Sequence, residues 1–384
     1  RQILQVQPNH PDALHLLGMI AYQVGRHDVA VRYISQAIVC NPKEAGFHNT
    51  IGEAYRAQGK LEEAAVHYRH ALALNPAHAE AHSNLGLVLW LQGRLDEALT
   101  HLRKALDLKP ALVEAHNNLG NILKDQGRLT EAEASYLQAL ALKPAYAEAR
   151  NNLGVVLRKQ GKLEEAVAHF QQVLALKPNL AEVYDNLAGT FNAQGKQEEA
   201  VDFYRRALTL KPGLSRSHSN LLLVMSYDPA AGPATIFAEH RKWSETHARS
   251  LTPAIRTHQN NRDSERRLRI GYVSGDFCNH PIGYWIEPLL AAHHRSDMEI
   301  VCYSAVANSD MTTKRLEILA DGWRAIAGMN DEDAATLISA DRIDILVDLS
   351  GHTAGNRLLV FARKPAPIQA TYLGSLTTTG LSTM

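Results

Sequence analysis

The stretch from residue 79 to residue 112, AEAHSNLGLVLWLQGRLDEALTHLRKALDLKPAL, decides the fold of the first half of this chain. Apolar residues recur in it at three- and four-residue intervals on both sides of Gly93, which predicts two amphipathic helices joined by a glycine turn. Small residues such as Gly86 and Ala98 are predicted to let a neighbouring backbone come close. Pro110 ends the second helix, because its ring lacks an N–H and clashes with the preceding turn.

The same unit recurs with a period of 34 residues, which is typical of a stacked repeat array. Six copies and the opening of a seventh begin at Pro11, Ala45, Ala79, Val113, Ala147, Ala181 and Ser215. Their residue pattern is that of the tetratricopeptide repeat. Such arrays form superhelices that hold an extended partner, so the first half of the chain is predicted to bind a polypeptide.

A column of asparagines occupies one position on the first helix of successive copies. Its members are Asn84, Asn118, Asn152, Asn186 and Asn220. A carboxamide offers a donor and an acceptor, so the column matches the N–H and C=O groups of an extended peptide without reading its side chains. The alternative is that each asparagine only bonds the adjacent repeat, and the sequence leaves both interpretations open.

Beyond the repeats the apolar period changes from helical to strand-like. Residues 227–267 are predicted to form a helical linker, and residues 268–384 an α/β domain in which strands and helices alternate. This alternation predicts βαβ units and a parallel sheet whose ligands lie beyond the carboxyl ends of the strands. The loops to inspect are SGDFCNHP, SGHTAGNR and LGSLTTTG, and none of them is a dinucleotide fingerprint or a Walker loop.

Composition and charge argue against several classes of protein. Lys plus Arg equals Asp plus Glu, 40 against 40, so neither a nucleic acid nor a membrane surface is a predicted partner. The sequence has no apolar run of the ~20 residues that span a bilayer, and no signal peptide at its start. Three cysteines without C-x-x-C spacing predict a cytoplasmic protein without disulfides or zinc. Many of the 19 histidines lie at equivalent repeat positions, so no metal is expected.

Three segments downstream of the repeats carry a resemblance to a known family. RLRIGYVSGDFCNHP, ILVDLSGHTAGNR and KPAPIQATYLG resemble the protein O-linked N-acetylglucosamine transferase family. The resemblance implies an α superhelix of tetratricopeptide repeats over residues 1–226, followed after the linker by the N-terminal Rossmann-like lobe of a two-Rossmann-domain glycosyltransferase. It also implies inverting transfer of N-acetylglucosamine from UDP-GlcNAc to Ser or Thr of acceptor proteins or peptides, which the concave face of the repeats would bind. No cofactor and no metal are implied.

The resemblance assigns a role to His280. This histidine lies in the NHP motif and matches the family's active-site histidine. An imidazole with a pKa of about 6.5 suits either orienting an acceptor hydroxyl or taking its proton, and both roles stay open. The motif also predicts a helix start, with Asn279 as the cap and Pro281 as the first helical residue.

The other predicted site residues lie in the neighbouring loops. They are His352 in the GHT motif as a second catalytic residue, the possible orienting groups Asp276 and Asp348, and the substrate-binding residues Gly374, Thr378 and Thr379 in the loop that resembles the family's sugar-contacting loop. The family pattern in that last loop is close to LGYPGTTG. Ser375, Leu376 and Thr377 depart from this pattern, which removes the rigid turn that a proline would fix.

Two other functions stay open. Plant-type members with a GHT loop transfer fucose from a GDP-fucose donor, and the altered last loop also fits a peptide-binding scaffold without catalysis. The sequence begins without Met and ends without a closing element. It is therefore interpreted as a fragment that lacks the C-terminal lobe, and the 384 residues alone are predicted to be inactive.

Overall fold

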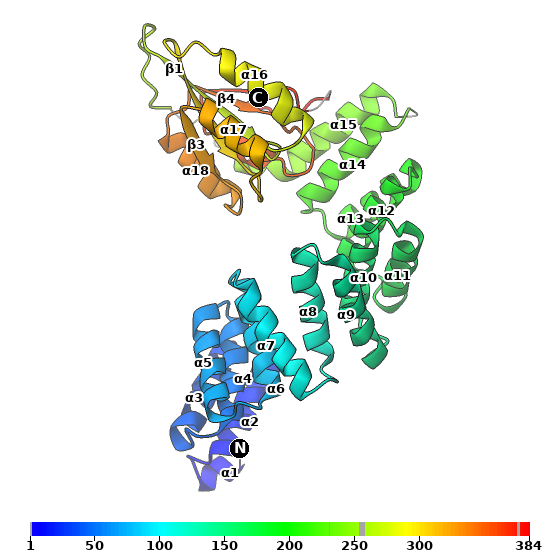
Figure 1. The fold of residues 1–384 in the computed structure, drawn as a ribbon, viewed down its shortest axis with the longest axis vertical. Coiled ribbons are helices and arrows are strands. Elements are labelled where there is room, and N and C mark those ends of the chain that lie inside the picture. The colour runs from blue at the N-terminus through cyan, green and yellow to red at the C-terminus, as the bar shows by residue number, and fades with distance from the viewer. Residues whose placement is uncertain (1, 230, 253–257, 375–376) are drawn as a thin grey trace. The chain divides into compact units, whose positions relative to one another are not determined.

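A computed structural model of the chain describes residues 2–229, 231–252, 258–374 and 377–384. The chain divides into two compact units, residues 1–178 and 179–384 (Figure 1). The sequence pattern placed the end of the repeats at residue 226, whereas the division into compact units falls at residue 178. The sixth repeat and the helix that opens the seventh are therefore parts of the unit that holds the sheet.

The first unit consists of helix pairs. Its helices are α1 Gln2–Val6, α2 Pro11–Gln23, α3 His27–Cys40, α4 Ala45–Ala57, α5 Leu61–Leu74, α6 Ala79–Leu91, α7 Leu95–Leu108, α8 Val113–Asp125, α9 Leu129–Leu142, α10 Ala147–Lys159 and α11 Leu163–Leu176. The first helices of successive repeats contact each other, α4 with α6 and α6 with α8. The six predicted repeat starts are confirmed, because each is the first residue of a helix.

Glycine acts at two places in each repeat. The glycines between the paired helices have φ values from +75° to +80°, a left-handed conformation that glycine adopts without steric cost. The glycine inside the first helix faces a large side chain of the second helix: a Cβ added at Gly120 would lie 2.6 Å from the ring of Tyr136, and one added at Gly86 would lie 2.8 Å from Leu102. Tyr136 is fully buried and its hydroxyl donates to Asn121 at 2.7 Å. The predicted close approach is therefore that of the second helix of the same repeat, through its side chains and, at Gly86, also through the Ala98 carbonyl oxygen at 3.2 Å.

The second unit begins with four helices and continues into an α/β fold. Its elements are α12 Ala181–Ala193, α13 Gln197–Leu210, α14 Ser215–Tyr227, α15 Pro233–Trp243, β1 Leu268–Ser274, α16 Pro281–Ala292, β2 Met298–Ser304, α17 Met311–Leu319, β3 Gly322–Ala325, α18 Asp331–Ala340, β4 Ile345–Asp348, α19 Leu358–Ala362 and β5 Ile368–Thr371. A π-helical turn, Ser244–Ala248, and a 3-10 turn, Arg249–Leu251, follow α15.

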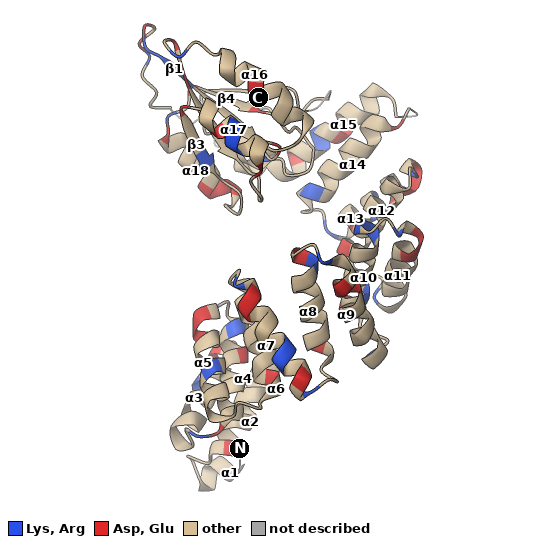
Figure 2. Cartoon of the chain, in the orientation of Figure 1, with Lys and Arg blue, Asp and Glu red and all other residues tan. Residues whose placement is uncertain are grey.

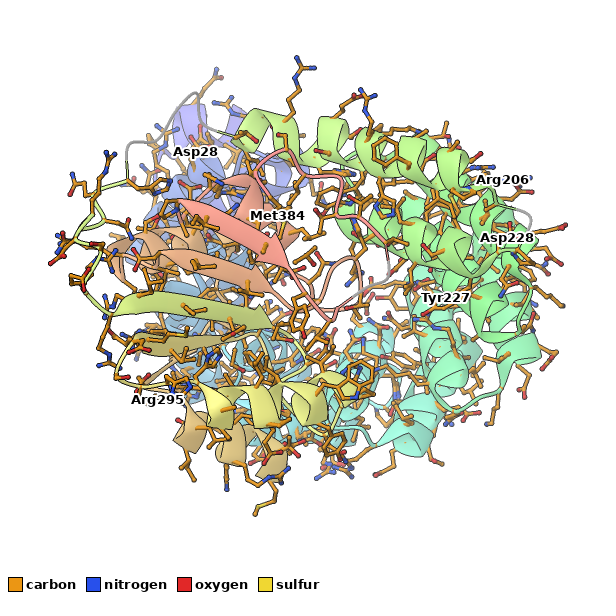
Figure 3. The ribbon with its side chains drawn as sticks, turned by 90° about the horizontal axis from the view of Figure 1, so that it is seen from above. Asp28, Arg206, Tyr227, Asp228, Arg295 and Met384 are labelled. Atoms are coloured by element: carbon orange, nitrogen blue, oxygen red, sulfur yellow. The ribbon has the colours of Figure 1, made fainter. Side chains whose placement is uncertain are left out.

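The sheet is parallel, as predicted, with the strand order β3-β2-β1-β4-β5. Helices α16 and α17 cover one face, where Ile286 and Leu316 pack on the apolar residues of β1 and β2. Helices α18 and α19 cover the other face (Figure 1). Leu222 of α14 and Trp243 of α15 belong to that second core, and Met384 packs against it (Figure 3). The last repeat helix and the sheet therefore share one apolar core.

Charge is distributed without a dominant sign. Figure 2 shows Lys and Arg interspersed with Asp and Glu along the helices of each unit. Among the described residues, no helix combines the length and the apolar character that a bilayer crossing requires.

Candidate functional site

The loops that follow β1 and β4 meet at the carboxyl edge of the sheet. The Oγ atoms of Ser274 and Ser350 lie 3.5 Å apart. A Cβ added at Gly275 would lie 3.0 Å from the carbonyl oxygen of Gly355, so the two loops pack backbone to backbone. The loops after β1 and β4, which the sequence singled out as candidate ligand-binding loops, therefore contact each other at the carboxyl edge of the sheet.

His280 is the N-cap of α16. Its Nδ1 accepts a hydrogen bond from the N–H of Ile282 at 3.3 Å, and Pro281 is the first helical residue. The prediction that Asn279 is the cap was wrong, because the Asn279 side chain accepts a hydrogen bond from the Tyr284 hydroxyl instead. A ring nitrogen that accepts a bond carries no hydrogen, so Nε2 carries the proton of the neutral imidazole. His280 thus presents an N–H donor at the edge of the sheet.

Two further contacts fix the NHP loop. The Asp310 carboxylate caps α17 through the N–H of Thr313 at 2.8 Å and accepts the N–H of Asn279 at 2.6 Å. A Cβ at Gly283 would overlap the carbonyl oxygen of Cys278, so only glycine lets α16 begin this close to the loop. The backbone on both sides of His280 is therefore fixed, at Asn279 by the Asp310 carboxylate and at Gly283 by close packing on the Cys278 carbonyl oxygen.

The two predicted aspartates differ in their surroundings. Asp348 is fully buried and accepts hydrogen bonds from the N–H groups of Ser350 and Gly351, at 3.2 and 2.8 Å, and from the Thr371 hydroxyl at 2.9 Å. Burial raises the pKa of Asp348 to about 6, although these three donors oppose the shift. Asp276 is half-buried, and burial raises its pKa while nearby His280 opposes the rise. Asp348 thus orients the GHT loop, and Asp276 lies in the electrostatic range of His280.

His352 is enclosed rather than exposed. It is 3% exposed, its Nδ1 lies 3.1 Å from the Ser219 hydroxyl, and its Nε2 lies 3.0 Å from the carbonyl oxygen of Thr379. The rings of His240 and Trp243 each have their centroid 4.8 Å from the His352 ring. Burial, reinforced by the neighbouring His240, lowers the pKa of His352 to about 3. Both ring nitrogens are therefore engaged inside the protein.

The last loop lies against the GHT loop and against α15. A Cβ at Gly374 would lie 2.5 Å from backbone atoms of Leu349 and Ser350, so this glycine is required for the packing of the two loops. The Thr378 hydroxyl accepts the N–H of Gly380 at 3.1 Å, and Thr379 is buried. Of the segment that departs from the family pattern, Ser375 and Leu376 lie outside the described residues.

The asparagine column is partly used within the repeats. The Asn84 carboxamide donates to Asn49 at 3.0 Å, and that of Asn152 donates to Asn117 at 3.2 Å, so each bonds the first helix of the preceding repeat. Asn186 also has an interaction partner. Within the described part of the chain, the carboxamides of Asn118 and Asn220 make no hydrogen bond and are half-buried. Asn84 and Asn152 therefore join adjacent repeats, whereas Asn118 and Asn220 have carboxamides that could bind a peptide.

Sequence reasoning missed the junction between α14, α15 and the sheet. Ser219, His240 and Trp243 are each 1–2% exposed and lie around His352. The sequence signal for this junction was weak: Ser219 directly follows His218, which occupies a repeat histidine position. Nothing in the repeat pattern paired Ser219 with His352, 133 positions later. In the residues that the structure describes, no three His, Cys, Asp or Glu side chains converge as a metal site.

Two known regions account for most of the chain. Residues 52–93 and 91–127 match the family described as TPR repeat, and residues 111–179 and 147–212 match the one described as Tetratricopeptide repeat. Residues 234–384 match Glycosyl transferase family 41. As the resemblance predicted, the chain carries tetratricopeptide repeats followed by a family 41 glycosyltransferase region.

Individual proteins are similar to parts of this chain. The chain is 38% identical over 167 residues to Probable UDP-N-acetylglucosamine--peptide N-acetylglucosaminyltransferase SPINDLY of Petunia hybrida. The aligned residues cover 42% of this chain and 18% of that protein. It is 34% identical over 161 residues to UDP-N-acetylglucosamine--peptide N-acetylglucosaminyltransferase of Caenorhabditis elegans, over 40% of this chain and 14% of that protein. The solved O-GlcNAc transferase of Thermobaculum terrenum aligns with a TM-score of 0.65 and 35% identity, over 71% of this chain and 52% of that one. The chain thus spans about half of the bacterial structure and less than a fifth of these curated relatives.

Proposed function

We propose that this chain is the acceptor-binding and first catalytic part of a protein O-GlcNAc transferase. In this proposal the enzyme transfers N-acetylglucosamine from UDP-GlcNAc to Ser or Thr hydroxyls with inversion, in the cytoplasm and without a metal. The observation that carries the proposal is His280, which is fixed as a helix cap at the carboxyl edge of a parallel sheet with Nε2–H free of protein partners among the described residues. Ligands of such sheets bind at that edge.

The geometry favours an orienting role for His280. Because Nδ1 accepts the Ile282 N–H, the neutral ring can donate a hydrogen bond through Nε2 but has no free lone pair with which to accept a proton. A hydroxyl that accepts this bond keeps a second oxygen lone pair, which would attack the anomeric carbon of the sugar while the bond from that carbon to the diphosphate oxygen breaks and UDP leaves. Asp276 lies four residues before His280 in the same loop after β1 and is half-buried, and this burial raises its pKa. We assign Asp276 to receive the proton of the acceptor hydroxyl.

The repeats supply the acceptor in this proposal. Asn118 and Asn220 are the column members whose carboxamides remain available to the backbone of an extended peptide. Both curated relatives described above are named UDP-N-acetylglucosamine--peptide N-acetylglucosaminyltransferases, which supports a polypeptide acceptor and UDP-GlcNAc as the donor.

The test is transfer of radiolabelled sugar from UDP-GlcNAc to a protein lysate by the chain expressed in its full reading frame. We compare His280→Ala with His280→Asn, because asparagine is also a good N-cap and so preserves the start of α16 while it removes the imidazole. Both variants are expected to lose transfer by ~100-fold or more, the scale of a lost proton-transfer or orienting group. Transfer by His280→Asn at the wild-type rate would show that the imidazole only caps the helix.

Two further arms separate the alternatives. GDP-fucose replaces UDP-GlcNAc in the first arm, and transfer from GDP-fucose alone would identify an O-fucosyltransferase. Residues 1–384 by themselves form the second arm. They are expected to be inactive, because they span 52% of the bacterial O-GlcNAc transferase that they match. Binding of peptides without transfer from either donor by the full protein would instead indicate a scaffold.

A further inference from the structure

Ser219 occupies a repeat position with a recurrent structural use. The equivalent residues in two earlier repeats, Asn49 and Asn117, accept hydrogen bonds from the column asparagine of the following repeat. The side chain at this position therefore connects one repeat to the next. Helix α14 belongs to the last repeat-like unit, so its Ser219 faces a different neighbour.

That neighbour is the glycosyltransferase region. The Ser219 hydroxyl lies 3.1 Å from Nδ1 of His352, and Nε2 of the same ring lies 3.0 Å from the Thr379 carbonyl oxygen. A carbonyl oxygen only accepts, so Nε2 must carry the hydrogen and Nδ1 must accept from the Ser219 hydroxyl. The result is a link of two hydrogen bonds, in which Ser219 of α14 donates to His352 of the GHT loop and His352 donates to Thr379 of the last loop.

The surroundings of this hydrogen-bonded link are closely packed and exclude water. Ser219, His352 and Thr379 are 2%, 3% and 4% exposed. On the side of α15, a Cβ at Gly380 would lie 2.5 Å from the carbonyl oxygen of His240, so the last loop is pressed against that helix. A lost hydrogen bond here leaves a buried polar atom without a partner, and water cannot easily replace it.

We propose that Ser219 and His352 are positioning residues. They hold the end of the peptide groove, the concave face of the repeats that would bind the acceptor, in register with the catalytic edge, the carboxyl edge of the sheet at His280. Asn220, the last member of the asparagine column, is adjacent to Ser219 in the same helix, while Thr379 lies in the loop that follows the catalytic edge. The link fixes the acceptor relative to the sugar site, and neither residue of the link touches substrate. This inference rests on the proposed function and assigns the specificity for polypeptide acceptors over water to the junction.

The test measures two reactions of the full-length protein with one donor. Transfer to a protein acceptor requires the groove and the edge together, whereas hydrolysis of UDP-GlcNAc uses water and requires only the edge. For Ser219→Ala we expect the ratio of transfer to hydrolysis to fall by about 10-fold, the scale of one buried hydrogen bond, mainly through the KM of the acceptor. The matched control is Ser83→Ala, which removes a buried hydroxyl at the same repeat position in α6 and is expected to leave the ratio unchanged.

The outcomes separate this inference from the proposed function. An equal fall of transfer and hydrolysis in Ser219→Ala would overturn the inference, because it would place the link in the chemistry itself. Transfer and hydrolysis that both stay at the wild-type rate would also overturn it. Absence of both reactions in the wild-type protein would reject the proposed function, and hydrogen exchange then decides the inference. We expect Ser219→Ala, but not Ser83→Ala, to raise the exchange of amides in residues 350–353 and 377–381. Unchanged exchange there would show that no link exists.

Discussion

His82 and His218 occupy the same position of the repeat, yet they have different structural roles. In α6, Nδ1 of His82 lies 2.9 Å from Nδ1 of His101, and its Nε2 bonds the Pro76 carbonyl oxygen in a half-exposed site. In α14, His218 is 2% exposed, with Nδ1 at 3.0 Å from His247 and Nε2 at 2.9 Å from Glu239. The first histidine bonds groups of its own and the preceding repeat, and the second bonds α15 and the π-helical turn after it, which the repeat pattern does not contain.

The difference shows how a repeat helix is adapted to a new neighbour. The first helix of the repeat is kept, because α14 has the length of the earlier first helices, but α15 has 11 residues against 14 in α7. What changes is the chemistry of the side that meets the glycosyltransferase region. There, buried imidazoles, a carboxylate and an indole replace the small apolar residues and carboxamides of the earlier repeats.

Acid is expected to produce the largest effect on this junction. Burial lowers the pKa of His240 and of His247 to about 4, and that of His352 to about 3, from an ordinary value of 6.5. Between pH 6.5 and about 4 the unfolded chain binds protons at these rings and the folded unit does not, so the free energy of unfolding falls as pH falls. Asp348 opposes this fall, because its pKa is raised to about 6 and the folded unit takes up its proton first. We expect a net loss on the order of 5 kcal/mol by pH 4.5, measured by urea unfolding of the second unit.

A pair of substitutions sharpens the acid prediction. His240 has both ring nitrogens buried without a partner among the described residues, so His240→Phe removes one titrating group and leaves no hydrogen bond broken. We expect this variant to be at least as stable as the wild type at pH 7 and to lose less stability in acid. His82→Phe serves as the comparison. It is expected to reduce the pH dependence of the free energy of unfolding by a smaller amount, because His82 is half-exposed. Equal pH slopes for wild type and His240→Phe would contradict the prediction.

The glycine position of the repeat gives the next largest contrast. Gly120 in α8 and Leu222 in α14 are equivalent, and Leu222 is fully buried in the core shared with the sheet. Leu222→Ala is expected to lower the free energy of unfolding of the second unit by about 3 kcal/mol through a cavity. Gly120→Ala is expected to cost about 2 kcal/mol in the first unit for the opposite reason, since the new Cβ would lie 2.6 Å from the Tyr136 ring. Urea unfolding followed by hydrogen exchange of each unit measures both, and a stabilising result for either would contradict the packing described here.

The two equivalent histidines supply a smaller effect. His218→Ala leaves Glu239, which is 13% exposed, without its shortest partner, and we expect a loss of about 2 kcal/mol at pH 7. Lys242 at 3.2 Å continues to pair with Glu239 and limits the loss. His82→Ala is expected to cost less than about 1 kcal/mol, because its site is open to water. If His218→Ala and His82→Ala lower the free energy of unfolding by the same amount, the burial of His218 at the junction does not strengthen its interaction with Glu239.

The sequence predicted the elements well and the contacts between distant elements poorly. The strands, the parallel sheet and the starts of the repeats follow from periodicity, proline and glycine, which are local signals. His280 was also placed correctly at the start of α16, but its own role as the cap was missed, because histidine is a less common cap than the adjacent asparagine. The partners of His352 were unpredictable, since Ser219 and Thr379 come from separate parts of the chain. Such pairs depend on how the helices after the repeats pack on the sheet.

The smallest predicted effect separates the two uses of the asparagine column. Asn84 donates to Asn49 and to Glu53 at 3.0 and 3.1 Å, and Glu53 is a carboxyl whose pKa burial raises, so Asn84→Ala should cost stability. Asn118 makes no such bonds in the described structure, so Asn118→Ala should leave the urea midpoint unchanged and weaken peptide binding about 3-fold to 5-fold, the value of one net hydrogen bond. Fluorescence anisotropy with a labelled Ser/Thr-rich acceptor peptide measures the affinity. A loss of stability without a loss of affinity in Asn118→Ala would mean that the column serves only to join the repeats.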